Sequence, residues 1–231
     1  MSLIFSIISC LLFLFLGCND TSTINSDDTN ANDSTFTDIR DNRKYTIVKI
    51  GEQVWMSENL QTSTYRNGDP IQYANSNQEW LDFAYVGEGA WCYYENDDQN
   101  GMKYGKLYNW YAVNDSRGLA PKGYHIPSDA EWTVLSDYLV GAKIAGFKMK
   151  SITGWQNNGN GDNSSGFNGL PGGARLYNGT FYDIGQHGGW WSSTEDDTEF
   201  AWRRGLGYDN VGLGWDNQSK ARGYSVRCLK N

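Results

Sequence analysis

The chain of 231 residues carries few of the side-chain patterns on which enzymes most often rely. Its two histidines, His125 and His187, lie far apart in the sequence, and no HExxH, CxxC or HxH spacing is present, so a zinc site is not expected. No GxSxG elbow, P-loop or GxGxxG motif after a strand is present either, which excludes the common hydrolase and nucleotide-binding signatures. We interpret His125 as a hydrogen-bonded structural histidine rather than a catalytic base.

Carboxylates are plentiful and keep a glycosidase open as an alternative. A glycosidase needs two carboxylates at a fixed separation across the scissile bond, and the sequence alone does not fix that separation. Acidic residues in loops are more often solvated surface. The candidates are Asp97, Asp98, Glu195, Asp196, Asp197, Glu199, Asp209 and Asp216.

One short segment copies part of a calcium-binding loop. Asn96, Asp98 and Asn100 place oxygen ligands at alternate positions before Gly101, as in the first half of an EF-hand loop. The twelfth position is Leu107, where an EF-hand needs a bidentate glutamate, so an EF-hand is excluded. A structural calcium ion at the three polar residues stays open, and no other cofactor is expected.

Aromatic residues in the second half of the chain offer a different chemistry. Tryptophan and tyrosine faces beside Asn and Asp side chains suit carbohydrate recognition, because one end of the ring is apolar and the other can hydrogen-bond. We expect at least half of these rings to lie in the core, and Tyr208 and Trp215, which stand among Gly and Asp, to be exposed on a ligand-binding surface. The rings considered are Trp190, Trp191, Trp202, Tyr208 and Trp215.

The N-terminus predicts export and lipidation. Residues 2–17 form one uncharged apolar run, shorter than the roughly 20 residues that span a bilayer. A short apolar run that ends at a small residue is typical of a secretory signal peptide. Residues 15–18, FLGC, resemble a bacterial lipobox, with Phe15 where leucine is usual and no basic residue before the apolar run. We therefore expect residues 1–17 to be a signal peptide and Cys18 to carry the lipid anchor.

The segment that follows is expected to be a tether. Residues 18–36 are mostly Asn, Asp, Ser and Thr, with too little apolar surface to offset the entropy of ordering. One domain is expected over residues 37–231. The net charge of −8 argues against nucleic acid as a partner. We predict an extracytoplasmic protein on the bacterial cell surface or outer membrane, held to the membrane through Cys18.

Two cysteines remain in the domain, because Cys10 lies in the signal peptide and Cys18 is lipidated. Cys92 and Cys228 would lie in an oxidising compartment, where one disulfide can form. The alternative is two separate buried thiols, since free cysteine is often buried. Neither cysteine has a sequence context that lowers a thiol pKa, which counts against a redox enzyme.

Helix signals are concentrated in the middle of the chain. Ser128 and Glu131 form a capping box, and apolar residues on one face with Gly141 at the end predict a helix over residues 129–140. A second helix is expected over residues 143–150. The spacing of Tyr104, Leu107, Tyr108 and Tyr111 predicts an amphipathic helix over residues 104–113.

Strand signals lie on both sides of these helices. Residues 45–50 and 53–58 alternate around Gly51-Glu52 and predict a hairpin, and residues 90–94 predict a buried strand. A strand-rich second half completes an α+β order. Its expected strands are 166–176, 189–193, 200–205 and 224–229.

Taken in order, six segments resemble the Fibrobacter succinogenes major paralogous domain, a family of secreted and surface bacterial proteins. The segments are YTIVKIGEQVWMSENLQT (45–62), KYGKLYNWYAV (103–113), LAPKGYHIPSDAEWTVL (119–135), GFNGLPGGARLYNGTFYDIG (166–185), WWSSTE (190–195) and GYSVRCLKN (223–231). The resemblance implies a C-type lectin-like fold, with two main helices packed on a small, twisted, mostly antiparallel sheet. It also implies that the N- and C-terminal strands are close together, which would ease a Cys92–Cys228 bridge.

The calcium-dependent sugar site of the C-type lectins is not expected. None of the four prolines has the flanking amide and carboxylate that those lectins use, and Trp215-Asp216-Asn217 only resembles their Trp-Asn-Asp. We predict a surface lipoprotein that binds a glycan or another surface protein. The alternatives are an extracytoplasmic enzyme, either a glycosidase or an oxidase like the formylglycine-generating enzymes of the same fold, and a structural envelope protein without a discrete ligand.

Overall fold

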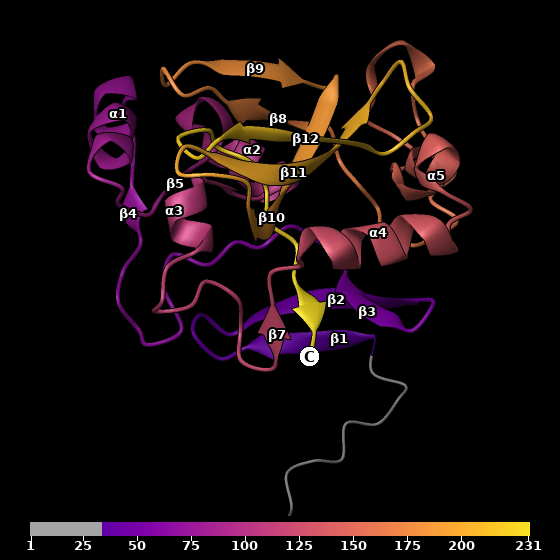
Figure 1. Cartoon of the computed structure of the whole chain (residues 1–231), viewed down its shortest axis with the longest axis horizontal. Helices are drawn as coiled ribbons and strands as arrows, with labels where there is room; N and C mark the ends of the chain where they lie inside the picture. Colours follow the sequence, from indigo (N-terminus) through magenta and orange to yellow (C-terminus); the bar gives the residue numbers. More distant parts are fainter. Residues whose placement is uncertain (1–33) are drawn as a thin grey trace, which may run out of the picture. The chain divides into compact units, whose positions relative to one another are not determined.

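Two five-stranded sheets form the framework of the chain in a computed structural model, which describes residues 34–231 (Figure 1). These residues make one compact unit, Ser34–Asn231. Helices accompany mostly antiparallel strands, so the α+β class is confirmed. The predicted signal peptide, Cys18 and most of the predicted tether lie outside the described residues.

The first sheet joins the two ends of the described chain. Its order is β1 (Thr35–Asp38), β2 (Arg43–Ile50), β3 (Gln53–Met56), β13 (Leu229–Lys230) and β7 (Tyr124–His125). The β2–β3 pair is the predicted hairpin around Gly51-Glu52. Because β13 pairs with both β3 and β7, the expected closeness of the N- and C-terminal strands is confirmed.

The second sheet carries most of the strand-rich second half. Its order is β12 (Gly214–Ser219), β11 (Phe200–Gly207), β10 (His187–Glu195), β8 (Gly172–Arg175) and β9 (Phe181–Ile184). The β10–β11–β12 meander is antiparallel, while β8 runs parallel to β10. Three of its strands overlap segments predicted to be extended. The predicted strand at 224–229 is reduced to β13 and to single bridges at Tyr224 and Ser225.

Helix α4 (Asp129–Tyr138) lies between the two sheets in Figure 1. Its predicted capping box is present, with Ser128 accepting from the backbone of Glu131 and the Glu131 carboxylate accepting from the backbone of Ser128. The helix ends two residues before the predicted end. Helix α5 (Ala142–Met149) matches the second predicted helix to within one residue at each end.

Three further helices are found in the described residues. Helix α1 (Asn77–Tyr85) has a capping box of Ser76 and Glu79 that the sequence analysis overlooked. Helix α2 (Asp98–Tyr104) and the single turn α3 (Trp110–Val113) flank a small third sheet. That sheet consists of β4 (Gln72–Tyr73), β5 (Ala90–Cys92) and β6 (Leu107–Tyr108), and two 3-10 turns, Tyr94–Asn96 and Gln156–Asn158, complete the elements. Five helices therefore replace the two main helices expected.

The predicted helix over residues 104–113 is wrong. Gly105, with a φ of 81°, ends α2, and the next residues enter β6 to pair with β5. Tyr104, Leu107 and Tyr108 are all buried, so their spacing reflects contacts with different neighbours rather than one face of a helix. The same apolar spacing can arise from a strand between two short helices.

The expected tether also ends earlier than residue 36. Thr35 and Phe36 belong to β1, and the Phe36 ring stacks on Tyr45 and Tyr124 with centroid separations of 5.4 and 4.2 Å. The partly buried Phe36 ring packs against the first core cluster, and the β1–β2 ladder holds the segment in the sheet. The described domain therefore begins before residue 37.

The interior contains three clusters of buried apolar residues, and each of them includes at least one tryptophan. In the second cluster Trp55 packs on Trp132 of α4 at 4.7 Å, which holds α4 against the first sheet. Trp190 of β10 packs edge-on against Phe167 in the same cluster. Many of the aromatic residues of the chain therefore lie in the core.

The disulfide between Cys92 and Cys228, which the sequence left undecided, is not formed. Cys92 and Cys228 are both free and fully buried, and they lie in different clusters. Cys92 lies on β5 beside Tyr94 and Leu107, whereas Cys228 lies just before β13. The alternative reading of two separate buried thiols is the one that the structure shows.

Candidate functional site

A polar hollow of about 350 Å³ lies on the β10–β11–β12 meander and the loop between β11 and β12. Glycines form much of its wall, and we call it the glycine-lined hollow. It contains charged side chains, an exposed tryptophan and a histidine, which makes it the best candidate for ligand recognition among the described residues. Its lining residues are His187, Arg203, Gly205, Leu206, Gly207, Asp209, Asn210, Gly212, Gly214, Trp215 and Asp216.

The hollow exists because side chains are absent at alternate positions of two strands. Residues two apart on a strand point to the same face, so Gly205 and Gly207 share a face with Arg203. Gly214 of β12 lies directly opposite Gly205. A Cβ at Gly205 would clash with Nη1 of Arg203 and would lie 2.9 Å from Nε2 of His187. Glycine is therefore required at Gly205, because any side chain there would occupy the space in which Arg203 and His187 meet.

Three side chains from three strands join across this gap. The Arg203 guanidinium donates from Nη1 to Nε2 of His187 at 2.8 Å, and its Nε lies 2.7 Å from Oδ1 of Asp216. Because arginine can only donate, Nε2 of His187 accepts and its ring proton must be on Nδ1. Strand pairing sets the Arg203–Asp216 contact, since these residues are opposite each other in the ladder.

The charge state of the trio follows from burial. Removal from water, reinforced by the positive charge of Arg203, lowers the pKa of His187 to about 3. The imidazole is therefore neutral at physiological pH, and Arg203 and Asp216 supply the two opposite charges. Nδ1 of His187 is buried and has no partner among the described residues.

A buried lysine shapes the rim of the hollow. Lys150 follows α5 and is 2 % exposed. Its Nζ donates to the carbonyl oxygens of Gly159, Gly207 and Asn210 at 2.6, 3.1 and 2.8 Å. Two of these acceptors belong to the hollow, so a single ammonium group fixes the rim to the neighbouring loop. A rim held in this way keeps its shape without a ligand.

The two predicted ligand-surface aromatics have different environments. Trp215 is 59 % exposed at the edge of the hollow, on β12, and the Arg204 guanidinium lies 5.9 Å from its ring centroid. Successive residues of a strand point to opposite faces, so the Trp215 side chain lies on the face of its ladder partner Arg204, whereas Asp216 lies on the face of Arg203 and the glycines. Tyr208 is half-buried against the second core cluster.

The other aromatics of this region serve the core. Trp190 and Trp191 are fully buried, and Trp202 is half-buried. The indole nitrogen of Trp190 donates to Asn59, and that of Trp191 donates to the carbonyl of Tyr108. Two of the five rings considered therefore lie in the core, which is fewer than the half that was expected.

The remaining chemical candidates are tied into the fold. Both ring nitrogens of His125 are hydrogen-bonded, Nε2 to Glu131 and Nδ1 to Asn231, each at 2.8 Å. Burial raises the pKa of the Cys92 thiol to about 11 and that of Cys228 to about 12. Thiols of this kind are poor nucleophiles, which weakens the case for an oxidase.

The segment with calcium-loop spacing forms a 3-10 turn followed by α2. The side-chain amides of Asn96 and Asn100 donate to the carbonyls of Asn75 and Tyr94, and Asp98 lies in the first turn of α2. Within residues 34–231, no group of three or more His, Cys, Asp or Glu side chains could hold a metal ion. Calcium at this segment stays a prediction.

Sequence reasoning missed the polar trio. It noted His187 without a role, counted Asp216 among many carboxylates, and did not consider Arg203 or the glycines. The available signal was the alternation of glycine from Gly205 to Gly207 beside a charged residue, which indicates an open strand face.

The fold and this site define a class: an α+β domain with a fixed polar hollow on a twisted meander. The chain belongs to the Fibrobacter succinogenes major domain family, whose model matches residues 48–230. No curated protein and no solved structure matches the chain. No helix of residues 34–231 is both long and apolar enough to cross a membrane.

Proposed function

We propose that this chain is a lipid-anchored protein of the bacterial cell surface whose domain, of the C-type lectin-like fold, binds a carbohydrate at the glycine-lined hollow. The observation that carries this proposal is the pre-formed set of polar groups in the hollow, with the exposed Trp215 at its edge, on the opposite face of β12 from Asp216. Sugars present apolar C–H faces and hydroxyls together, and aromatic rings beside hydrogen-bonding groups suit both.

The geometry supports recognition more than catalysis. Arg203 and Asp216 are joined as an ion pair, and His187 is neutral and tied to Arg203. Groups that already neutralise one another are suited to positioning hydroxyls, whereas a general acid or base needs a pKa near the working pH. The volume of the hollow, about 350 Å³, lies at the lower end of the range of about 300–1,000 Å³ that ligand pockets usually have. A hollow of this size suits a single sugar unit.

A glycan array tests the binding proposal. The probe is the unit of residues 34–231, which keeps all of β1, and it is compared with Trp215→Ala. We expect the parent to bind at least one class of glycan and Trp215→Ala to lose that signal. A matched control is Tyr177→Ala, which removes an aromatic ring that is 57 % exposed elsewhere on the surface.

Parallel thermal melts separate loss of binding from loss of fold. Retained binding by Trp215→Ala, or equal loss by Tyr177→Ala, would contradict the assignment of the hollow. Absence of binding to every glycan would reject the carbohydrate proposal. Repeating the array with a chelator tests calcium, since dependence on calcium would point to Asn96, Asp98 and Asn100.

Lipidation is tested separately in a bacterial host. We expect the full chain to fractionate with membranes and to lose residues 1–17, and Cys18→Ser to be released in soluble form or to remain uncleaved. Mass spectrometry of the mature N-terminus reads both changes directly. An unmodified Cys18 in the parent would reject the anchor without affecting the glycan proposal.

A further inference from the structure

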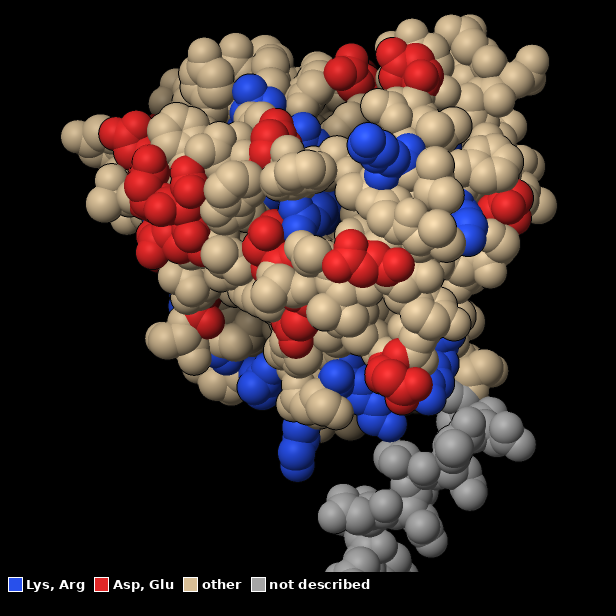
Figure 2. Space-filling view, turned by 45° about the vertical axis from the view of Figure 1, so that its right-hand side comes forward, with Lys and Arg blue, Asp and Glu red and all other residues tan. Residues whose placement is uncertain are grey.

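Positive charge is concentrated in one part of this acidic domain. The first sheet and the loop before β7, residues 34–56, 121–125 and 229–231, contain six Lys and Arg and three Asp and Glu. The other described residues contain thirteen Lys and Arg and twenty Asp and Glu. Figure 2 shows the resulting gathering of Lys and Arg at the lower end of the domain, where Figure 1 places the first sheet. We call this part the basic end.

Most cations of the basic end are free to meet an outside partner. Arg40 and Lys49 are the exceptions, because Arg40 is buried in an ion pair with Asp38 at 2.6 Å and Lys49 lies 3.4 Å from Glu52. Within the described residues, Lys44, Lys122 and Lys230 have no carboxylate partner within 4.0 Å. Unpaired lysines on one face are suited to a polyanionic surface rather than to the stability of the fold.

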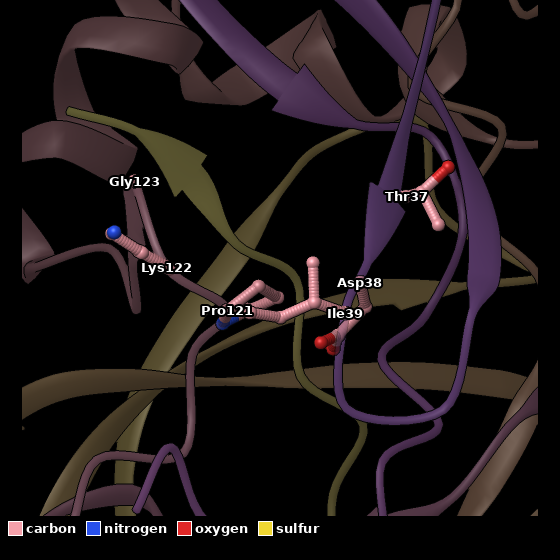
Figure 3. A pocket seen from close by; sticks show the side chains of 6 residues that line it. All are labelled: Thr37, Asp38, Ile39, Pro121, Lys122 and Gly123. Carbon is pink, nitrogen blue, oxygen red and sulfur yellow. The ribbon is translucent and has the colours of Figure 1, made fainter. Parts of the chain in front are cut away.

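An exposed apolar side chain stands among these charges. Ile39, in the turn between β1 and β2, is 76 % exposed. Together with Pro121 and Lys122 it lines a second hollow of about 360 Å³, shown in Figure 3. Thr37 lies in the same lining and is paired with Lys44 across the β1–β2 ladder. An apolar tip flanked by lysines is the arrangement that interfacial membrane contacts use.

The chain also enters the domain at this sheet. Ser34 directly precedes β1, and fifteen residues, 19–33, separate it from Cys18. Even fully extended, these residues span at most about 54 Å. An anchor at Cys18 would therefore keep the basic end within reach of the bilayer at a high local concentration.

We propose that the basic end docks on the surface of an anionic lipid bilayer, with Lys44 and Lys122 facing the headgroups and Ile39 entering the interface. The glycine-lined hollow lies on the other sheet and is left free for its ligand. The proposal goes beyond glycan binding and is testable without the anchor.

Co-sedimentation with vesicles tests it, using residues 34–231, which form one compact unit with its own core. The vesicles contain phosphatidylglycerol and phosphatidylcholine, or phosphatidylcholine alone. We expect binding only to the anionic vesicles, with a loss at high salt. The double variant Lys44→Glu/Lys122→Glu should bind at least about tenfold more weakly, since each lysine near an anionic surface contributes about fivefold.

Matched variants separate this surface from net charge and from folding. Lys103→Glu/Lys143→Glu makes the same charge change at exposed lysines outside the basic end and should bind as the parent does. Ile39→Ser should weaken binding, whereas Ile152→Ser, at a residue that is 64 % exposed elsewhere, should not. Equal effects of the two double variants, or no binding of the parent to anionic vesicles, would overturn the proposal. Each outcome is independent of the glycan array.

Discussion

Two arginines of this domain illustrate opposite uses of the same side chain. Arg227 is fully buried and donates to Asn59 and to the carbonyls of Phe167 and Asn168, so its hydrogen bonds join segments distant in the sequence. Arg203 lies in the glycine-lined hollow, with 13 % of its side chain exposed, and its polar partners are His187 and Asp216.

The contrast separates scaffold from site. Around Arg227 the acceptors are neutral carbonyl and amide oxygens, which satisfy its N–H groups but do not neutralise its charge, and the Phe167 ring lies 4.1 Å from the guanidinium. Around Arg203 a carboxylate neutralises the charge, and glycines leave the opposite side open. A charge that is paired and accessible can exchange partners with a ligand, whereas one enclosed by the chain holds the fold.

The largest expected effect comes from removing the enclosed arginine. Arg227→Ala leaves each of the four acceptors of its hydrogen bonds with one donor fewer and creates a cavity, so we expect the free energy of unfolding to fall by about 3–5 kcal/mol. Arg203→Ala should lower it by about 1 kcal/mol or less, because a partly exposed ion pair contributes little. Chemical denaturation of both variants measures the difference. Similar losses would remove the distinction between the two regions.

The second-largest expected effect is that of a substitution at a glycine of the hollow. Gly205→Ala places a methyl group against Arg203 and His187, and we expect a loss of about 1–3 kcal/mol in the free energy of unfolding from overpacking. Glycan binding should fall further than this loss explains, because the polar trio must move. Gly214→Ala, where the nearest outside atom is 3.6 Å from the added Cβ, is the matched variant and should be milder.

The buried histidine predicts an acid-sensitive fold. The pKa of His187 is lowered to about 3 in the folded protein, so between pH 5 and about 6.5 the unfolded chain binds the proton and the folded chain does not. Stability therefore rises with pH across this window, by up to about 1.4 kcal/mol per pH unit from this residue.

His187→Asn should flatten that slope, and unfolding midpoints measured at several pH values above 5 test it. Carboxylates with ordinary pKa values titrate below this window and do not obscure it. An unchanged slope in the variant would show that His187 is accessible to protons in the folded protein.

The smallest expected effect concerns the thiols. Because Cys92 and Cys228 are unpaired, a reducing agent should leave the melting temperature of residues 34–231 unchanged. Their burial and raised pKa values should also prevent alkylation until the protein unfolds. A lower melting temperature under reduction would indicate a disulfide and contradict the separation of the two core clusters.

Local signals in the sequence were sufficient for several elements. The capping box of Ser128 and Glu131 predicted the start of α4, and the alternation around Gly51-Glu52 predicted the β2–β3 hairpin. Interactions between neighbours along the chain determine both features. Helix α1 has the same kind of local signal, a capping box of Ser76 and Glu79.

Long-range pairing is where sequence reasoning failed. Tyr104, Leu107 and Tyr108 show helical spacing, yet β6 pairs with β5 and interrupts any helix there. The choice between a helix and a strand depended on the partner strand, which the local pattern does not reveal. The same limit explains why the pairing of Cys92 with Cys228 was left open, since only the packing of separate clusters decides it.

The sequence by itself determined the family, the α+β class, the capped helix α4 and the aromatic character of the domain. The tertiary structure decided which rings were core and which remained exposed, and it assembled the candidate site. Arg203 meets Asp216 and His187 only through the register of three strands, and the hollow between them is space left by glycines. The register of the strands and the space beside the glycines both depend on how distant segments pack together, so no single segment of the sequence determines them.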